Sequence, residues 1–543
     1  MRYKMSWRLY PLFGALLLLA SVVMAGCGSG ENGSSPTDPT VTFGTPNELT
    51  TLDPINSQEP YTLQVIGQLT EGLVTLNGEN KLVGDLARDW DHDSDYTTWR
   101  FQIREGVRFH EHPIFDSLGS GRTLDAEDVR YSFERAVSSE SYPAFVLAGV
   151  VEGVGAYQNG DSDHVSGFTV VDSLTFQIEL SRPDPSFLHR ITSPWFGIYP
   201  DEVQELEGQT FGQDAFIGTG PFELVSRSDT RVRLRRFEDY WGATKGNVEE
   251  LEFRVVKNDQ LRLQELRNGN IDLMRAPTSL LSTITKEGTL ELQQSADLEG
   301  ERYNTFNSSF IGFNSNEMDR PLRRAISHAV DREELANTIT FGSGRPTIGT
   351  VPDGMGYDPL SAEGWHDPEQ ARRLVEKSSY AGQPIELLVH GQKNVGQLGE
   401  LVAQQLSEVG IEIELNNLSY NTVVQRMIDG NTEAFALSLE YVYSAPAPIL
   451  FDVFHSGKTP APNFWRYESA KVDSMLVRLR GVAEQSKSNK IAHEIERTVA
   501  QDAPAAFLYQ LRKLALHRPT VSGISFNGHS IPLLWNVRVQ TET

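Results

Sequence analysis

Two short segments combine residue types that could bind a metal ion or a phosphate. His110, Glu111 and His112 place two imidazoles beside a carboxylate, but no third ligand follows at a recognisable spacing. The preceding residues 106–109 are typical of a loop, which favours a polar surface turn over a metal site. Gly218-Thr-Gly-Pro-Phe222 is glycine-rich, yet it lacks the lysine and following Ser/Thr of a phosphate-binding loop. It is better explained as a tight turn between strands, and we expect neither a metal nor a cofactor.

The common signatures of enzymes are also missing from the sequence. It contains no G-x-S-x-G elbow, no P-loop, no H-E-x-x-H helix and no C-x-x-C pair. Its single cysteine, Cys27, lies near the N-terminus, so neither an internal disulfide nor a cysteine-based metal cluster can form. We therefore expect a binding protein and not an enzyme.

Flat aromatic rings and acidic groups, which a ligand cleft requires, gather between residues 420 and 467. The set comprises Tyr420, Glu440, Tyr441, Tyr443, Phe454, His455, Phe464, Trp465 and Tyr467. Aromatic side chains also fill hydrophobic cores, so each of them is as readily explained by the core as by a ligand.

The elements that must position these side chains are clearest at residues 384–416. Residues 385–389 form an apolar run with strand character, and apolar side chains follow at helical spacing up to residue 409. Gly410 stands where a helix C-terminus favours a left-handed residue. Residues 411–415 then alternate apolar and acidic side chains, as a half-buried strand does. The pattern predicts a βαβ unit with parallel strands.

Other segments also indicate an α/β fold. Apolar residues recur at helical spacing over 321–336 and 490–502, which predicts two further helices. Residues 169–180 and 231–236 are typical of β-hairpins. The sequence shows no internal repeat.

Length and charge limit the architecture and the partners. The chain has 543 residues, whereas single cores stop growing at roughly 250–300 residues, so we expect at least two lobes. The formal net charge is −25, which repels the phosphates of nucleic acids and anionic lipids. Nucleic acid is therefore not an expected partner, and solubility is the simplest explanation of the acidity.

The first forty residues resemble an export signal. Arg2, Lys4 and Arg8 are followed by an uncharged apolar run at 12–24, which is short for a transmembrane helix. Small residues precede Cys27, as in bacterial lipoprotein signals, where the cysteine is acylated and anchors the protein to a membrane. We expect a signal peptide at 1–26, a flexible tether at 27–40 and a lipid-anchored location in the periplasm or cell envelope. The alternative is a cleaved secretory signal in which Cys27 is incidental.

A series of motifs in a shared order resembles the peptide/nickel-binding family, family five, of bacterial extracellular solute-binding proteins. These proteins are the receptors of ABC importers. The motifs are Leu52-Asp-Pro54, Glu71-Gly-Leu-Val74, Asp85-Leu-Ala87, Trp90, residues 99–110, Asp125-Ala-Glu-Asp-Val129, Tyr131-Ser132, Gly218-Thr-Gly-Pro-Phe222, Asp239-Tyr-Trp-Gly242, residues 268–272, Phe313-Asn314, residues 323–332 and Gly410-Ile-Glu-Ile413. Residues 113–123 are an insertion relative to the family pattern.

The resemblance implies a two-lobed periplasmic-binding-protein fold of class II with an extra third domain and a ligand cleft between the lobes. The first lobe would combine residues 41–75, 201–305 and 515–543. The extra domain would be 76–200 and the second lobe 306–514. A monomer would close its lobes around a small solute and deliver it to an ABC permease and its ATPase.

The resemblance also indicates ligand-binding residues. Peptide-binding members carry an aspartate that pairs with the ligand's amino terminus, but Val442 stands at that position here, and valine cannot pair with an ammonium group. Glu440 could substitute only through a bend, because adjacent side chains of a strand point to opposite faces. The predicted ligand-binding residues are Tyr61, Tyr420, Glu440, Tyr441, Val442 and Tyr443.

Three functions stay open from the sequence. The leading expectation is import of a peptide or peptide-like solute. A non-peptide solute, such as an oligosaccharide, an opine-like molecule or a metal complex, is the nearest alternative. A lipid-anchored periplasmic hydrolase or an envelope scaffold is the alternative of a different class.

Overall fold

The computed structural model describes residues 39–118, 121–206, 210–293, 297–391 and 393–540. The predicted signal peptide, Cys27 and nearly all of the predicted tether lie outside these residues. The described residues all belong to one compact unit. Among the helices of the described ranges, none has the length and apolar character needed to span a membrane.

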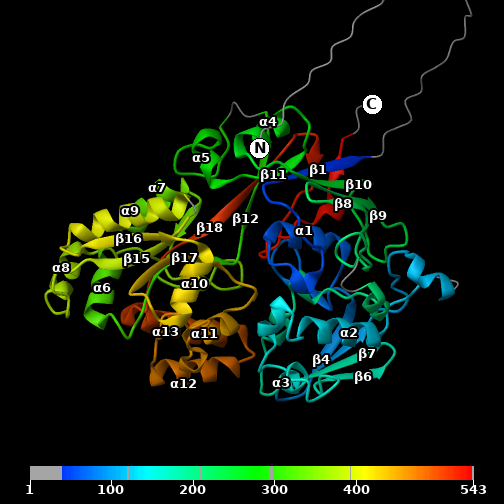
Figure 1. Ribbon diagram of the computed structural model, residues 1–543, viewed down its shortest axis with the longest axis horizontal. Helices are drawn as coiled ribbons and strands as arrows, with labels where there is room; N and C mark the ends of the chain where they lie inside the picture. Colours follow the sequence, from blue (N-terminus) through cyan, green and yellow to red (C-terminus); the bar gives the residue numbers. More distant parts are fainter. Residues whose placement is uncertain (1–38, 119–120, 207–209, 294–296, 392, 541–543) are drawn as a thin grey trace, which may run out of the picture. The chain divides into compact units, whose positions relative to one another are not determined.

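A large mixed sheet organises the described chain and contains strands from both ends of the sequence (Figure 1). Its main order is β16-β15-β17-β13-β18-β11-β1-β10-β9-β8, and β12 and β14 also pair with β18. The bounds are β1 (Thr40–Thr45), β8 (Phe222–Ser228), β9 (Arg231–Arg236), β10 (Glu250–Val255), β11 (Leu273–Arg275), β12 (Glu299–Asn304), β13 (Asn307–Phe313), β14 (Gly344–Pro346), β15 (Ile385–His390), β16 (Ile413–Leu418), β17 (Ala434–Glu440) and β18 (Ala505–His517).

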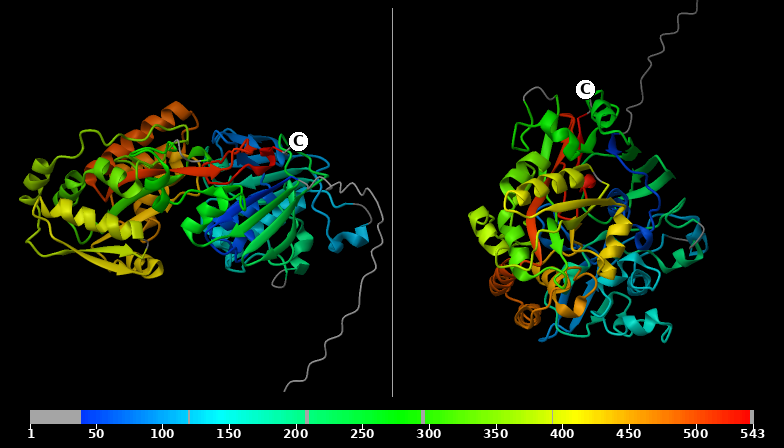
Figure 2. Two further views of the ribbon diagram at one scale, coloured as in Figure 1. Left: turned by 90° about the horizontal axis from the view of Figure 1, so that it is seen from above. Right: turned by 60° about the vertical axis from the view of Figure 1, so that its left-hand side comes forward.

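The strand β18 belongs to both halves of this sheet. Its first residues pair with β13, and its last residues pair with β11 and β12. The strand runs in red through the centre of the molecule in Figures 1 and 2. Beside it the chain passes from β12 to β13 through Thr305 and Phe306. These two neighbouring segments connect the halves, and we call them the connecting strands.

Helices cover the half of the sheet built from β13 to β17. The helix α9 (Lys393–Ser407) packs against β15, β16 and β17, while α6 (Arg320–Ala329) and α7 (Arg332–Thr340) pack against β18. The bounds of the other helices in this part of the chain are α8 (Pro368–Val375), α10 (Tyr420–Asp429), α11 (Pro446–Phe454), α12 (Ala470–Arg480) and α13 (Gln485–Asp502).

A separate four-stranded antiparallel sheet follows the first segment of the chain. Its order is β4-β5-β7-β6, and α2 packs on β6 and β7. The bounds are β4 (Ala87–His92), β5 (Thr98–Ile103), β6 (Phe168–Asp172), β7 (Thr175–Glu179) and α2 (Ala126–Ala136). The remaining elements are α1 (Pro60–Leu69), α3 (Val154–Gln158), α4 (Asp259–Arg267), α5 (Thr278–Ile284), β2 (Val74–Leu76), β3 (Leu82–Gly84), β19 (Val521–Ser522) and β20 (Arg538–Val539).

The predicted βαβ unit is confirmed, because β15 and β16 pair in parallel and α9 connects them. Gly410 adopts the expected left-handed conformation, with φ 84°. The helix at 490–502 exists as the C-terminal part of α13, and the hairpins at 169–180 and 231–236 are β6–β7 and β8–β9.

The helix predicted at 321–336 was wrong as one continuous element. The chain leaves the helical conformation at Val330, and the side chain of Asp331 accepts a hydrogen bond from the backbone of Glu334 to start α7. An aspartate at this position caps a new helix more readily than it continues an old one. The periodicity of the apolar residues did not reveal the break, because the buried residues keep nearly the same helical spacing from one helix to the next.

Candidate functional site

The register of the connecting strands places three polar side chains on one face of the sheet. Tyr303 of β12 lies directly opposite Lys513 of β18. Arg275 of β11 lies opposite Ala515, which is two residues from Lys513. Residues two apart on a strand share a face, so the side chains of Arg275, Tyr303 and Lys513 point the same way.

Two further side chains complete this group, which we call the hinge cluster: Tyr61, Arg275, Tyr303, Glu440 and Lys513. The guanidinium carbon of Arg275 lies 4.7 Å from the centre of the Tyr61 ring. The Nζ of Lys513 donates a hydrogen bond of 2.5 Å to Oε1 of Glu440, the last residue of β17. The cluster therefore joins α1, β11 and β12 to β17 and β18.

The electrostatics of the hinge cluster are dominated by two cations and one acid. Burial, followed by repulsion from Arg275, lowers the pKa of Lys513 to about 8, and Glu440 partly offsets this. The charge of Lys513 in turn lowers the pKa of Glu440. Nη1 of Arg275 is buried and has no hydrogen-bond partner among the described residues. The side chain of Glu440 is 49% exposed, whereas that of Lys513 is 16% exposed.

A fixed loop borders the hinge cluster. The amide of Gln64 on α1 donates to the carbonyl of Ser530 at 2.9 Å, and the side chain of Asn527 accepts from the backbone of His529 and Ile531. Burial lowers the pKa of His529 to about 4, so this imidazole is neutral near pH 7. These polar contacts hold the loop in a fixed position beside the hinge cluster.

Of the predicted binding residues, the structure brings Tyr61 and Glu440 together in the hinge cluster. Tyr441 and Tyr443 are buried, and their hydroxyls are already bonded: Tyr441 to Thr350, and Tyr443 to Asp452 at 2.6 Å. Val442 between them is partly buried and packs against the main core. Tyr441 and Tyr443 therefore position the segment after β17.

Tyr420 stands apart from the hinge cluster. It is the first residue of α10 and is 51% exposed, with its ring 5.6 Å from that of His390. Tyr142, at 41% exposure, lies in the segment after α2. Burial and then the nearby Tyr420 hydroxyl raise the pKa of Tyr142, so the two phenols approach one another although they come from distant segments.

Residues after β7 contact the segment that follows β17. Nδ1 of His189 lies 2.7 Å from Oγ of Ser444, and the guanidinium carbon of Arg190 lies 5.0 Å from the centre of the Tyr443 ring. The Arg190 guanidinium also donates to Asp184 at 2.9 Å. These contacts hold the 185–192 region against the end of β17.

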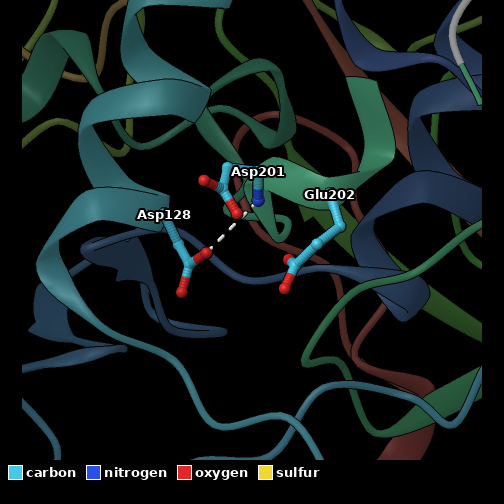
Figure 3. A group of neighbouring side chains, drawn as sticks. All are labelled: Asp128, Asp201 and Glu202. Carbon is cyan, nitrogen blue, oxygen red and sulfur yellow. Dashed lines mark hydrogen bonds between the residues drawn. The ribbon is translucent and has the colours of Figure 1, made fainter. Parts of the chain in front are cut away.

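One group of three carboxylates has the spacing of a metal site. Asp128, Asp201 and Glu202 point toward one another in Figure 3, and the backbone N–H of Asp201 donates to Asp128 at 3.3 Å. Arg122 donates to Asp128 at 2.7 Å and to Glu202 at 2.9 Å. The guanidinium partly offsets the negative charge of these acids and pins residues 201 and 202 to the start of α2, which is a structural role.

The histidines singled out in the sequence are also structural. The interpretation of His110 as part of a surface turn was wrong, since it is 1% exposed. Its Nδ1 accepts from the N–H of Gly218 at 3.3 Å, and its Nε2 donates to the carbonyl of Gly220 at 3.0 Å. Burial lowers its pKa to about 4, which keeps the ring neutral. His110 therefore holds the glycine-rich turn, while His112 accepts from the N–H of Ile114.

Motif residues from separate parts of the chain form hydrogen bonds to one buried carboxyl group. Glu71 accepts hydrogen bonds from the hydroxyl of Tyr240 at 2.7 Å and the indole of Trp241 at 2.9 Å. Burial raises the pKa of Glu71 to about 7 and also raises that of its neighbour Asp85. This set joins the large sheet to the region before β4 and belongs to the scaffold.

Arg275, Tyr303, Lys513 and His529 were not among the binding residues predicted from the sequence. A signal existed for two of them, because Arg275 and Lys513 are cations within short apolar strand sequences. Their proximity depends on the pairing of β11 and β12 with β18, which no local pattern specifies.

Comparisons with known proteins agree with this architecture. Residues 81–461 match the sequence profile of "Bacterial extracellular solute-binding proteins, family 5 Middle". The dipeptide-binding protein DppE of Bacillus subtilis is 22% identical over 95% of this chain and 97% of its own length. The periplasmic murein peptide-binding protein MppA of Escherichia coli is 23% identical over 89% of each chain.

Solved structures show the same two-lobed fold. HbpA2 from Haemophilus parasuis superposes with a TM-score of 0.77 at 20% identity, over 92% of this chain and 100% of that one. The unliganded open form of MppA gives a TM-score of 0.75 at 21% identity, over 93% and 98%. The binding protein AgaA in complex with agropinic acid gives 0.71 at 20% identity, over 93% and 99%. Since the family profile covers more than half of the sequence, the chain belongs to family 5 of the bacterial extracellular solute-binding proteins.

Proposed function

We propose that this protein captures a peptide or peptide-like solute between two lobes and delivers it to an ABC permease and its ATPase. The observation that carries the proposal is the hinge cluster, in which charged groups from both halves of the large sheet meet beside the connecting strands. Groups that converge from two lobes can contact a ligand together only when the lobes are closed, so these contacts stabilise the closed, ligand-bound state. The names of many relatives, including the dipeptide-binding proteins, support a peptide as the solute.

The proposed lobes follow the sheet. The first lobe comprises residues 41–75, 201–305 and 515–543, and the second comprises 306–514, so that one boundary falls between β12 and β13 and the other falls within β18. Residues 76–200, with the four-stranded sheet, form the extra domain. We place Tyr61 and Glu440 beside the solute in the cleft and Tyr420 at its rim.

We also propose that the chain is a monomer in the periplasm or cell envelope, anchored to a membrane through acylated Cys27, and that it makes or breaks no bond. The apolar run before Cys27 and the small residues beside it support the anchor. The bonded state of Tyr441, Tyr443 and the histidines supports binding without catalysis, since these groups serve the scaffold.

A non-peptide solute is the second candidate, and the absence of an acid at Val442 favours it. A thermal-shift titration distinguishes the two. We expect a random tripeptide pool to raise the melting temperature of the full chain, while a pool of neutral oligosaccharides leaves it unchanged. The reverse pattern would overturn the peptide assignment and leave the family assignment intact.

A further inference from the structure

Glu440 is poorly suited to bind an amino terminus, although it is the acid nearest the missing aspartate position. Its carboxylate already accepts the hydrogen bond from Lys513 at 2.5 Å. A ligand ammonium that bound the carboxylate would lie beside the charges of both Lys513 and Arg275, and Arg275 already lowers the pKa of Lys513. Two fixed cations next to the only acid of the cluster repel a third cation.

The five residues of the cluster themselves carry two cations and one anion, and Glu59, which precedes α1, also attracts the charge of Arg275. Arg275 and Lys513 are cations, and Glu440 is the one anion of the cluster that lies between them. Among the described residues, Arg275 has neither an ion pair nor a hydrogen bond through its guanidinium, and its observed contact is the Tyr61 ring. Nη1 of Arg275 is out of contact with water and has no acceptor among the described residues, which is unfavourable unless an acceptor arrives with the ligand.

The surroundings of the guanidinium are suited to a carboxylate. A guanidinium presents parallel N–H donors that match two carboxylate oxygens. The Tyr61 ring lies over one face of Arg275, so a carboxylate would approach the edge of the guanidinium. The hydroxyl of Ser530 lies beside Lys513, and the neighbouring His529 is neutral near pH 7, so it adds no charge to the site.

We propose that the hinge cluster binds a carboxylate of the solute, so that the ligand is recognised through its acidic end and not through its amino terminus. Arg275 supplies the paired donors, Lys513 adds charge, and Glu440 holds Lys513 in place when the site is empty. The inference rests on the proposed solute-capture function and specifies the chemical class of the solute.

The test is affinity selection by the full chain from three forms of one tripeptide pool with neutral side chains: free, N-acetylated and C-amidated. We expect N-acetylation to change binding by less than threefold and C-amidation to weaken it by tenfold or more. Retained binding of the amidated pool, or loss of the acetylated pool, would overturn the proposal. Two further pools, one of small carboxylic acids and one of their neutral amides, test whether the site binds a carboxylate that is not part of a peptide.

The outcomes separate this inference from the proposed function. Capture of carboxylic acids but of no peptide would overturn peptide capture and support the carboxylate site. Capture of peptides irrespective of the C-terminal group would do the opposite. Capture only of neutral amides, or from none of the pools, would overturn both.

Variants assign the effect to the cluster. Arg275→Gln should abolish the discrimination between free and amidated peptides without lowering the ligand-free melting temperature, since it removes a cation that has no ion pair among the described residues. Arg231→Gln, on β9 with a side chain that is 50% exposed, is the matched control and should retain the discrimination. A lower ligand-free melting temperature with unchanged discrimination would mean that Arg275 is structural. Lys513→Gln is a second variant for the same test. It should weaken the discrimination between free and amidated peptides severalfold.

Discussion

At the residue scale, a substitution of Glu440 distinguishes recognition of a ligand ammonium group from recognition of a ligand carboxylate. If Glu440 bound a ligand ammonium, Glu440→Gln would weaken binding. In the carboxylate account it competes with the ligand for Lys513, so the same substitution strengthens binding of an N-acetylated peptide. Because Glu440 is half exposed, its pairing with Lys513 is worth about 1 kcal/mol or less, which limits the gain to roughly fivefold. Calorimetric titration of both proteins measures it, and a loss of affinity would refute the competition.

The ionisation of Lys513 makes binding depend on pH. Its pKa is about 8 in the ligand-free protein, so its charge is present below pH 8 and disappears above it. The groups that face it are Arg275, Glu440, Tyr303 and Ser530, and Glu440 is already ionised in this range. We expect the affinity for an N-acetylated peptide to fall as the pH rises from 7 to 9. Lys513→Gln should remove this slope, and an unchanged slope in the variant would place the titrating group elsewhere.

The same depressed pKa has a consequence for stability. In the unfolded chain the lysine has its ordinary pKa of 10.5, so the unfolded chain binds more protons between pH 8 and 10.5. This group therefore makes the ligand-free protein more stable as the pH rises through that window. The sign is opposite to that of ligand binding, which falls over the same range.

At the element scale, Asn307 ties the connecting strands together. Its amide donates to the carbonyl of Leu511 at 2.8 Å and its carbonyl accepts from the N–H of Leu511 at 2.7 Å. Asn307→Ala would remove both bonds and leave the carbonyl of Leu511 with the 3.4 Å bond from the Thr305 hydroxyl, at a cost of about 1–3 kcal/mol. Denaturant unfolding should show a destabilisation of this size, whereas Asn417→Ala, exposed on β16, should show little change.

His110 links the turn at residues 218–220 to the segment before the 113–123 insertion. Its folded pKa of about 4 lies below the ordinary 6.5, so the unfolded chain binds the extra proton between these values. Stability from this group is therefore present above pH 6.5 and is lost as the pH falls toward 4, by up to about 3 kcal/mol. Protonation would also break the bond from Gly218 to Nδ1.

The measurement is the free energy of unfolding between pH 7 and pH 4. The slope should be shallower in His110→Gln than in the wild type, and His92→Gln, on an exposed site, should keep the wild-type slope. Equal slopes in all three proteins would mean that His110 does not titrate in this range.

The elements differ in how far the sequence predicts them. The unit β15–α9–β16 follows from local periodicity, because both strands and the helix bury one side of a regular pattern. The break between α6 and α7 depends on a single capping side chain, Asp331, and was missed. The hinge cluster depends on β11, β12 and β18, which lie far apart in the chain, so its partners could be found only from the sheet register.

The motifs that identified the family turned out to describe the scaffold. Glu71, Tyr240 and Trp241 form one buried hydrogen-bonded set, and Asp53 of the Leu-Asp-Pro motif binds the guanidinium of Arg135 at 2.7 Å. Such residues preserve the fold while the ligand changes. The fold was therefore predictable from these residues, whereas ligand chemistry lies in residues outside the motifs.

At the scale of the whole molecule, the net charge of −25 opposes the approach of an anionic solute to a locally cationic cluster. Salt screens the long-range repulsion over about 10 Å at 0.1 M and affects the buried contact less. We expect the association rate of an N-acetylated peptide to rise between about 20 and about 200 mM salt. Stopped-flow kinetics would measure it, and an association rate that falls with salt would contradict the charge assignment of the solute.

Identification of the natural solute tests the central claim most directly. Native mass spectrometry of residues 38–543, followed by denaturing release, would reveal a molecule that the protein retains from its host. We predict a peptide or peptide-like solute with a free carboxylate, bound one to one. A neutral sugar, or a solute whose only charged group is an ammonium, would contradict the account.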